Sequence, residues 1–149
     1  MIETVRDVMT RNVEVLAADT PVTVAARKMK DLDIGSLPVC EGRRVVGILT
    51  DRDIVTRAVA DDLPPATTPV NEIMTRDPVT VREDAYLGEA EWVMREKQLR
   101  RLPVVDDKGN LVGYLAIARV ARTEELEETG RLLRGISGNR PPSARSKTG

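Results

Sequence analysis

Thr50 and Asp53 follow a short apolar stretch, and side chains of these types at this spacing suit a sugar phosphate. Residues 45–49 are typical of a β-strand, and the helix that we predict over 51–60 begins directly after them. The first turn of a helix has unpaired N–H groups and a partial positive charge, which favours a phosphate. A hydroxyl and a carboxylate there would add hydrogen bonds to the phosphate and to the two hydroxyls of a ribose.

The same Thr-x-x-Asp spacing also has a purely structural interpretation. It is close to the capping box, in which the threonine hydroxyl accepts from a backbone N–H. The acid three residues on then accepts from the backbone N–H of the threonine. Such a box begins a helix without any ligand. These residues alone leave ligand binding and helix capping both open.

Most other kinds of chemistry lack their usual residues. The sequence contains no histidine and one cysteine, Cys40, so it has neither the usual general base nor a Cys/His cluster for zinc. Cys40 lies in the apolar run 37–40, where we expect a small buried side chain rather than a reactive thiol. The sequence contains no phosphate loop and no dinucleotide fingerprint. We predict a protein that is not an enzyme and has no metal site.

The composition favours a globular protein that binds neither nucleic acid nor membranes. The chain has 149 residues, 41% hydrophobic and 32% charged, with a formal net charge of −1. A nucleic-acid-binding protein would show a basic excess, and no apolar run approaches the ~18 residues of a membrane span. One cysteine forms no internal disulfide and we see no signal peptide, so we predict a cytoplasmic location.

The sequence contains two copies of one pattern. Three separated segments recur in one register, at an offset of 65 or 66 residues, and the larger offset reflects one extra residue in a turn of the second copy. The segments are Met-Thr-Arg at 9–11 and 74–76, Leu-Pro-Val at 37–39 and 102–104, and Val-Gly at 46–47 and 112–113. This agreement indicates an internal duplication.

Each copy has the same predicted elements: a leading segment with a short strand, a helix, a β-hairpin and a second helix. We predict that Thr20 is the N-cap of the first helix, that Pro21 is its first residue and that Gly35 stops it. The other predicted elements of the first copy are 5–16, 37–40, 44–49 and 51–60, and those of the second are 70–81, 85–97, 102–105, 111–115 and a longer helix from 117.

These elements predict four regions along the chain. The first repeat covers 5–60, a linker with three prolines covers 61–69, and the second repeat with its extended last helix covers 70–136. Residues 137–149 have no apolar periodicity, and we predict a disordered tail. A repeat of about 60 residues buries too little surface to be stable by itself. The two repeats should therefore pack into one body.

These motifs resemble those of tandem CBS-domain proteins, a family named after cystathionine β-synthase. The resemblance rests on the repeated Met-Thr-Arg and on residues 34–39, 47–54, 99–105 and 112–113. It is closest to small bacterial proteins that consist of one CBS pair. It implies an α/β fold of the α+β type, in which two β-α-β-β-α repeats pack as a pseudo-two-fold pair and leave two clefts between them.

The clefts of this family bind adenine nucleotides such as AMP, ADP or ATP, or adenosyl compounds such as S-adenosylmethionine, and the resemblance implies no obligatory cofactor. It assigns the ribose and phosphate of one cleft to Thr50 and Asp53. It assigns the opposite wall to residues of the second copy, namely Thr75, Pro78, Val79, Leu99, Arg100 and Leu102. Arg100 would meet phosphate oxygens, although a solvated surface arginine is an equal interpretation.

The second copy departs from this pattern. Ala116 takes the place of Thr50, and Arg119 takes the place of Asp53. The cleft beside Ala116 should therefore not bind a ribose in the manner of the family. It would be walled by Thr10, Val13, Ile34 and Gly35. An arginine at a helix N-terminus is unfavourable with the helix dipole, so we predict that Arg119 contacts a phosphate in the neighbouring cleft or an acidic residue.

The resemblance also implies a homodimer formed through helices. Trp92 lies off the apolar stripe of its helix, where it either joins an interface or covers the edge of the core. Two functions follow from the sequence. In one, the protein is a sensor whose ligand shifts a conformational equilibrium and so modulates a partner protein. In the other, it is a ligand-free dimeric scaffold in which Thr50 and Asp53 only cap a helix.

Overall fold

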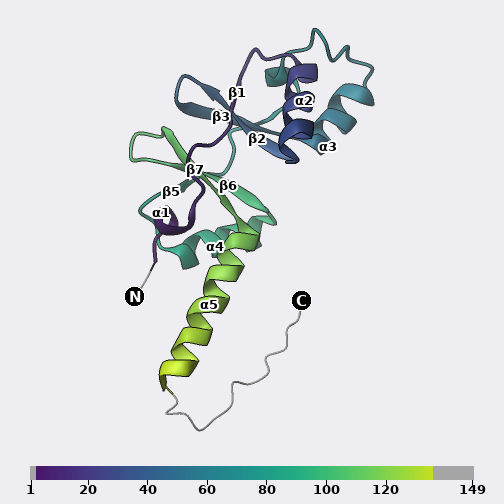
Figure 1. The fold of residues 1–149 in the computed structure, drawn as a ribbon. Coiled ribbons are helices and arrows are strands. Elements are labelled where there is room, and N and C mark those ends of the chain that lie inside the picture. The colour runs from purple at the N-terminus through teal and green to yellow at the C-terminus, as the bar shows by residue number, and fades with distance from the viewer. Residues whose placement is uncertain (1–2, 136–149) are drawn as a thin grey trace.

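The computed structural model describes residues 3–135, so the predicted tail and the predicted end of the second repeat at 136 lie outside the described residues. Two sheets with their helices follow one another along the chain (Figure 1). The first half contains α1 Val5–Val8, β1 Leu16–Ala17, α2 Val22–Leu32, β2 Ser36–Glu41, β3 Arg44–Thr50, α3 Asp51–Asp53 and the π-helix η1 Ile54–Val59. The second contains the 3-10 helix η2 Val70–Glu72, β4 Thr75–Arg76, β5 Val81–Arg82, α4 Leu87–Lys97, β6 Arg101–Val105, β7 Leu111–Ala116 and α5 Ile117–Gly135.

The two sheets have the same local topology. In the first sheet the strand order is β1-β2-β3-β4, and in the second it is β5-β6-β7. The first two strands of each sheet are parallel, and each hairpin is antiparallel. Figure 1 shows α2 and α3 beside the first sheet and α4 and α5 beside the second. The mixed α/β fold with two similar repeats is confirmed.

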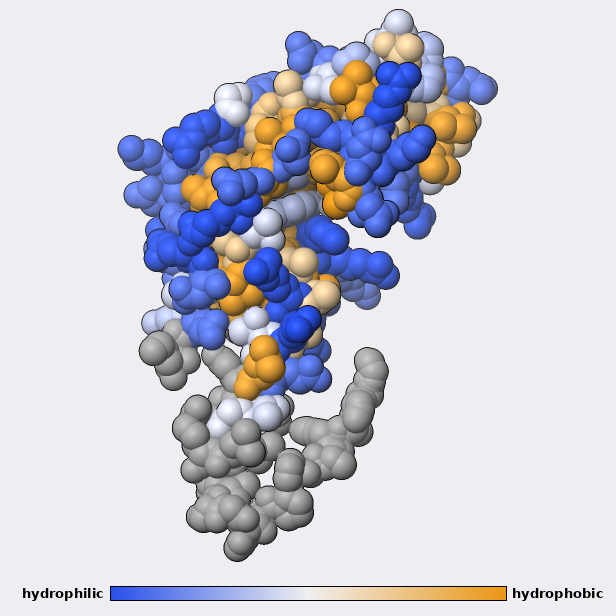
Figure 2. Space-filling view, in the orientation of Figure 1, coloured by the Kyte–Doolittle hydropathy of each residue, from blue (hydrophilic) through white to orange (hydrophobic). Residues whose placement is uncertain are grey.

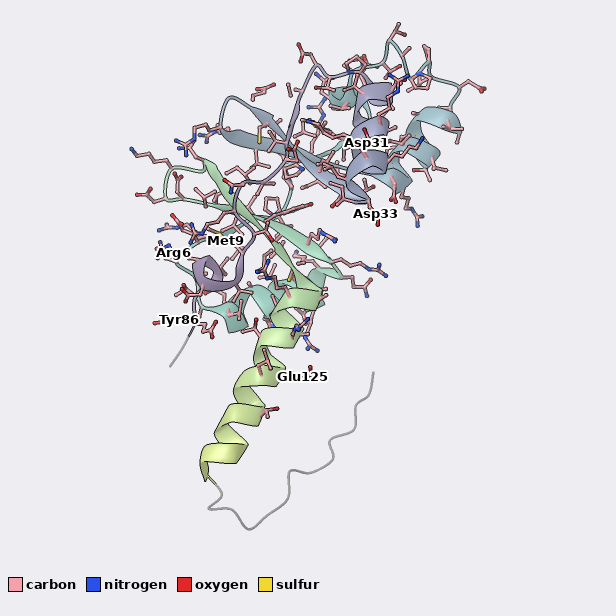
Figure 3. All side chains as sticks on the ribbon, viewed as in Figure 1. Arg6, Met9, Asp31, Asp33, Tyr86 and Glu125 are labelled. Carbon is pink, nitrogen blue, oxygen red and sulfur yellow. The ribbon has the colours of Figure 1, made fainter. Side chains whose placement is uncertain are left out.

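Each leading segment packs against the sheet of the other copy. Strand β4, from the second leading segment, pairs with β3 of the first hairpin, and Thr10 from the first leading segment pairs with Tyr114 on β7. Figure 3 shows Arg6 and Met9 beside the second sheet, away from Asp33 at the end of α2. The sequence pattern gave no sign of this exchange, which makes one folded unit of the two copies.

The exchanged segments supply part of each hydrophobic core. Val5, Val8 and Met9 are buried in the cluster of the second copy. The equivalent Val70, Ile73 and Met74 are buried in the cluster of the first copy. Its other core residues are Leu16, Val22, Ala25, Met29, Leu37, Val39, Leu49 and Ala58. Both cores consist of aliphatic and methionine side chains, as the absence of phenylalanine requires.

The repeated Met and Gly of the sequence meet in these exchanged contacts. A Cβ atom at Gly47 would collide with the sulfur of Met74, and a Cβ atom at Gly113 would collide with the sulfur of Met9. Glycine at both positions therefore lets the methionine of the other copy approach the hairpin strand closely. The pairing explains why both residue types recur in one register.

Two predicted helix boundaries were wrong. Helix α2 begins at Val22 with Pro21 as its N-cap, because the carbonyl of Thr20 instead accepts from the N–H of Val70 in the second leading segment, at 2.7 Å. The helix ends before Gly35, at Asp33, which adopts the left-handed conformation with φ of 57°. Val22, Ala25 and Met29 of α2 are buried, whereas Leu32 is 45% exposed, and Cys40 is buried as predicted.

Candidate functional site

Thr50 and Asp53 form a complete capping box in this structure. The N–H of Thr50 donates to Asp53 Oδ2 at 3.0 Å, and the N–H of Asp53 donates to Thr50 Oγ1 at 3.0 Å. Asp53 is buried, with 8% of its surface exposed. The structural interpretation of the spacing is thus realised, and ligand binding at the same pair stays a prediction. A carboxylate has about four acceptor positions, so the box occupies only part of its capacity.

Arg57 is a member of this site that the sequence interpretation missed. Its Nε lies 3.8 Å from Asp53 Oδ1, and its Nη1 donates to the carbonyl oxygens of Ile73 and Met74, each at 3.2 Å. The available signal was the i,i+4 spacing of an acid and an arginine on a helix, which usually marks a surface pair. Here the arginine also reaches the backbone of the second leading segment.

The predicted opposite wall is brought to Thr50 through strand pairing. Thr75 pairs with Ile48 on β3, two residues before Thr50, and Ser36 on β2 pairs with Thr50 itself. Thr75 is exposed, as a residue open to a ligand must be, whereas Leu102 is fully buried in the second core. The structure thus gives Leu102 a packing role.

The remaining predicted residues of this wall differ in their exposure. Pro78 and Leu99 are half-buried, and Val79 and Arg100 are exposed. The carbonyl of Arg100 accepts from the N–H of Ile117 at 2.8 Å, which holds this residue beside the start of α5. Their role in ligand contact stays a prediction.

A pocket of about 360 Å³ lies beside Ala116, in the second cleft. It is lined by Thr10, Asn12, Val13, Glu14, Leu32, Ile34, Ser36, Leu37, Arg101, Tyr114 and Ala116. The hydroxyl of Tyr114 shares a hydrogen bond of 2.9 Å with Ser36 Oγ, which links the two copies across this pocket. Burial raises the pKa of Tyr114, partly offset by that bond and by Arg101. The phenol is therefore protonated and able to donate near neutral pH.

Arg119 lies at the second cleft as well. Its Nη1 donates to Thr10 Oγ1 at 3.0 Å, and Thr10 lines the pocket beside Ala116. The partner that the structure shows is thus a neutral hydroxyl of the first leading segment rather than the acidic residue that the sequence suggested. The contact with a phosphate in the neighbouring cleft stays a prediction.

The described residues contain neither a metal-binding group nor a membrane-spanning helix. Within residues 3–135, no three histidine, cysteine or acidic side chains are grouped so that they could hold a metal ion. Across the same part of the chain, no helix has the length and apolar content needed to cross a membrane. Figure 2 shows hydrophilic residues over much of the visible face, with hydrophobic residues between them.

The fold is that of a CBS pair. It has one sheet in each copy, leading segments that are exchanged between the copies, and a helix that begins at each cleft. The CBS-domain profile matches residues 5–60 and 70–125, and the chain belongs to the CBS-domain family. It is 38% identical to hypoxic response protein 1 of Mycobacterium tuberculosis over 120 residues, which cover 80% of this chain and 83% of that protein. The crystal structure of that protein with two coordinated zinc ions matches with a TM-score of 0.74 and covers 80% of this chain and 98% of the other.

Two similar structures contain adenosine derivatives. CBSX2 of Arabidopsis thaliana in complex with AMP is 29% identical and matches with a TM-score of 0.73, covering 84% of this chain and 98% of that one. The CBS domain pair of MJ0100 in complex with 5′-methylthioadenosine and S-adenosyl-L-methionine is 26% identical, with a TM-score of 0.74, and covers 85% of this chain and 99% of that one. These two CBS pairs thus bind adenosine derivatives.

Proposed function

We propose that this protein is a regulatory sensor that binds an adenine nucleotide or adenosyl compound in the first cleft and modulates a partner protein. The observation that carries the proposal is the Thr50–Asp53 pair at the start of α3, joined through β3 and β4 to the leading segment of the other copy. Similar CBS pairs have been crystallised with AMP and with S-adenosyl-L-methionine. The proposed role requires binding and no reaction.

The capping box and the ligand can share Asp53. Asp53 Oδ2 accepts one backbone N–H, at 3.0 Å, and the carboxylate keeps further lone pairs for the hydroxyls of a ribose. Thr50 Oγ1 already accepts from the N–H of Asp53, but its own hydroxyl proton can be donated to a phosphate. The start of the helix and the exposed Arg100 would balance the phosphate charge.

A thermal-shift panel of AMP, ADP, ATP and S-adenosylmethionine tests the proposal, because selective binding to the folded state raises its stability. Asp53→Ala removes the acceptor but also breaks a capping box. Asp7→Ala is the matched control, since Thr4 and Asp7 form the same kind of box at α1. We expect at least one ligand to stabilise the wild type and Asp7→Ala but not Asp53→Ala. Equal shifts in all three proteins would place the ligand elsewhere.

A ligand-free dimeric scaffold is the second candidate, and two observations favour it. The capping box is complete without a ligand, and two aromatic side chains of α4 and its N-cap are exposed, Trp92 at 64% and Tyr86 at 59%. Large exposed aromatic side chains are common at protein interfaces. A homodimer in sedimentation experiments that dissociates on Trp92→Glu, together with no thermal shift from any of the four ligands, would favour the scaffold over the sensor.

A further inference from the structure

Arg57 contacts both walls of the first cleft. Its Nη1 donates to the carbonyl oxygens of Ile73 and Met74, and its Nε faces Asp53 Oδ1 at 3.8 Å. Ile73 and Met74 directly precede Thr75, which lies on the wall opposite Asp53 in the proposed site. One side chain therefore joins the acid of the first copy to the backbone that carries the other wall.

The second copy makes a related contact from a different position. The residues that match Asp53 and Arg57 there are Arg119 and Thr123. Arg119 donates to Thr10, which matches Thr75. In each copy, an arginine near the start of the second helix thus donates to the leading segment of the other copy. In the first copy this arginine lies one helical turn later and leaves the first-turn position to an acid.

The charge of Arg57 by itself explains little. Its side chain is 50% exposed and its nitrogen lies 3.8 Å from Asp53, so solvent screens the attraction. The geometry is more specific, because Asp53 is only 8% exposed and a buried carboxylate needs fixed partners. Arg57 is held by two backbone carbonyls of the other copy, and it therefore presents a fixed partner to Asp53.

We propose that Arg57 is a positioning residue for the adenosyl ligand. It orients Asp53 and fixes the second leading segment against it, so that a ligand bound at Asp53 also restrains residues 74–79. In the second copy, Arg119 occupies the position that matches Asp53 and donates to the leading segment of the first copy. This contact joins the two copies, but the ribose acceptor is missing there. The inference deepens the proposed function and rests on it for its ligand.

Arg76 provides a matched control. Its Nη2 donates to the carbonyl of Asn71 at 2.8 Å, so it also binds the backbone of the second leading segment. That bond lies within the segment and does not extend to Asp53. Arg57→Gln removes one positive charge and two arginine bonds to backbone carbonyls, and Arg76→Gln removes one positive charge and one such bond. Only Arg57→Gln removes the link between the two walls.

Calorimetric titration of the full chain with AMP and with S-adenosylmethionine measures the effect on affinity. We expect Arg57→Gln to weaken binding about tenfold, the scale of one charge-assisted hydrogen bond. Arg57→Lys should recover to within about threefold, because an ammonium can still donate to a carbonyl, and Arg76→Gln should stay within about twofold. Equal affinity in the wild type and Arg57→Gln, or equal losses in both glutamine variants, would overturn the proposal.

Amide hydrogen exchange supplies a readout that simple destabilisation would not reproduce. Ligand should slow exchange at residues 74–79 in the wild type and Arg76→Gln, and much less in Arg57→Gln. Without ligand, Arg57→Gln should speed exchange at Thr50, whose N–H is donated to Asp53, whereas Arg76→Gln should not. If the wild type binds neither probe and the thermal-shift panel shows no binding of ADP or ATP, the proposed function fails. Unchanged exchange at Thr50 in Arg57→Gln would then separately refute the positioning role.

Discussion

The junctions β3–α3 and β7–α5 share a backbone hydrogen bond and differ in chemistry. The N–H of Asp51 donates to the carbonyl of Gly35 at 2.9 Å, and the equivalent N–H of Ile117 donates to the carbonyl of Arg100 at 2.8 Å. The first junction carries a hydroxyl and an acid, and the second carries Ala116 and Arg119 at those places. The duplicated fold thus preserves this backbone bond while the side chains that would contact a ligand diverge.

The comparison separates the shape of a cleft from its chemistry. The pocket of about 360 Å³ lies beside Ala116, where the ribose acceptor is missing. The acceptor lies at the other junction, where Asp53 is bound by its own capping box. A cavity therefore does not by itself identify the nucleotide site in this chain, and the predicted acceptor must be tested directly.

The largest expected effect tests whether the two copies are equivalent in packing. Gly47→Ala and Gly113→Ala each place a Cβ against the methionine and backbone of the other copy's leading segment. We expect each variant to lower the free energy of unfolding by about 1–3 kcal/mol, the usual cost of overpacking. Urea denaturation followed by circular dichroism measures both. A neutral result at one position alone would show that the exchanged contacts are not equivalent.

The second prediction transfers the chemistry of the first junction to the second. The double variant Ala116→Thr with Arg119→Asp restores the Thr-x-x-Asp spacing at the start of α5. A new capping box and an acid at the helix N-terminus should stabilise the protein by about 1 kcal/mol, although the contact with Thr10 is lost.

Calorimetry sharpens this prediction if the proposed function holds. The stoichiometry of adenosyl ligand should rise from one toward two per chain in the double variant. The single variant Ala116→Thr is the control, since it adds the hydroxyl without the acid and should leave one site. One site in both variants would mean that the acceptor pair is insufficient in the second cleft.

The sequence allowed the duplication and most elements to be predicted, because hydrophobic periodicity and repeated motifs are local. It did not reveal the exchange of leading segments, since a repeat in register is compatible with packing in either copy. Arg57 was missed for a related reason: its spacing from Asp53 resembles an ordinary surface pair, and its contacts with Ile73 and Met74 are visible only after folding. Arg119 likewise meets Thr10 across more than half of the chain.

A smaller effect is expected at the hydrogen bond that crosses between the copies. Tyr114→Phe removes the bond to Ser36 and should lower the free energy of unfolding by about 1 kcal/mol. The folded-state pKa of Tyr114 is raised, mainly by burial. This group's contribution is therefore complete below its unfolded pKa of about 10 and is lost as pH rises through the higher folded value.

Denaturation at a series of alkaline pH values measures this contribution. The stability of the wild type should fall more steeply above pH ~10 than that of Tyr114→Phe. Tyr86→Phe is the control, because it makes the same substitution at a tyrosine that is 59% exposed. The same slope in all three proteins would show that Tyr114 does not join the copies through a protonated hydroxyl.

The smallest effect concerns a second difference between the copies, at the two leading segments. Asp7 accepts from the backbone N–H and the hydroxyl of Thr4, at 3.0 and 3.1 Å, whereas the matching residues in the second copy are Glu72 and Pro69. These bonds, with the backbone bond first, lower the pKa of Asp7. A depressed folded pKa gives stability that is present above the unfolded pKa of about 4 and is lost as pH falls through the folded value. Asp7→Asn should therefore flatten the acid limb of the stability curve measured by urea denaturation below pH ~4. An unchanged limb in Asp7→Asn would show that this box does not distinguish the leading segments energetically.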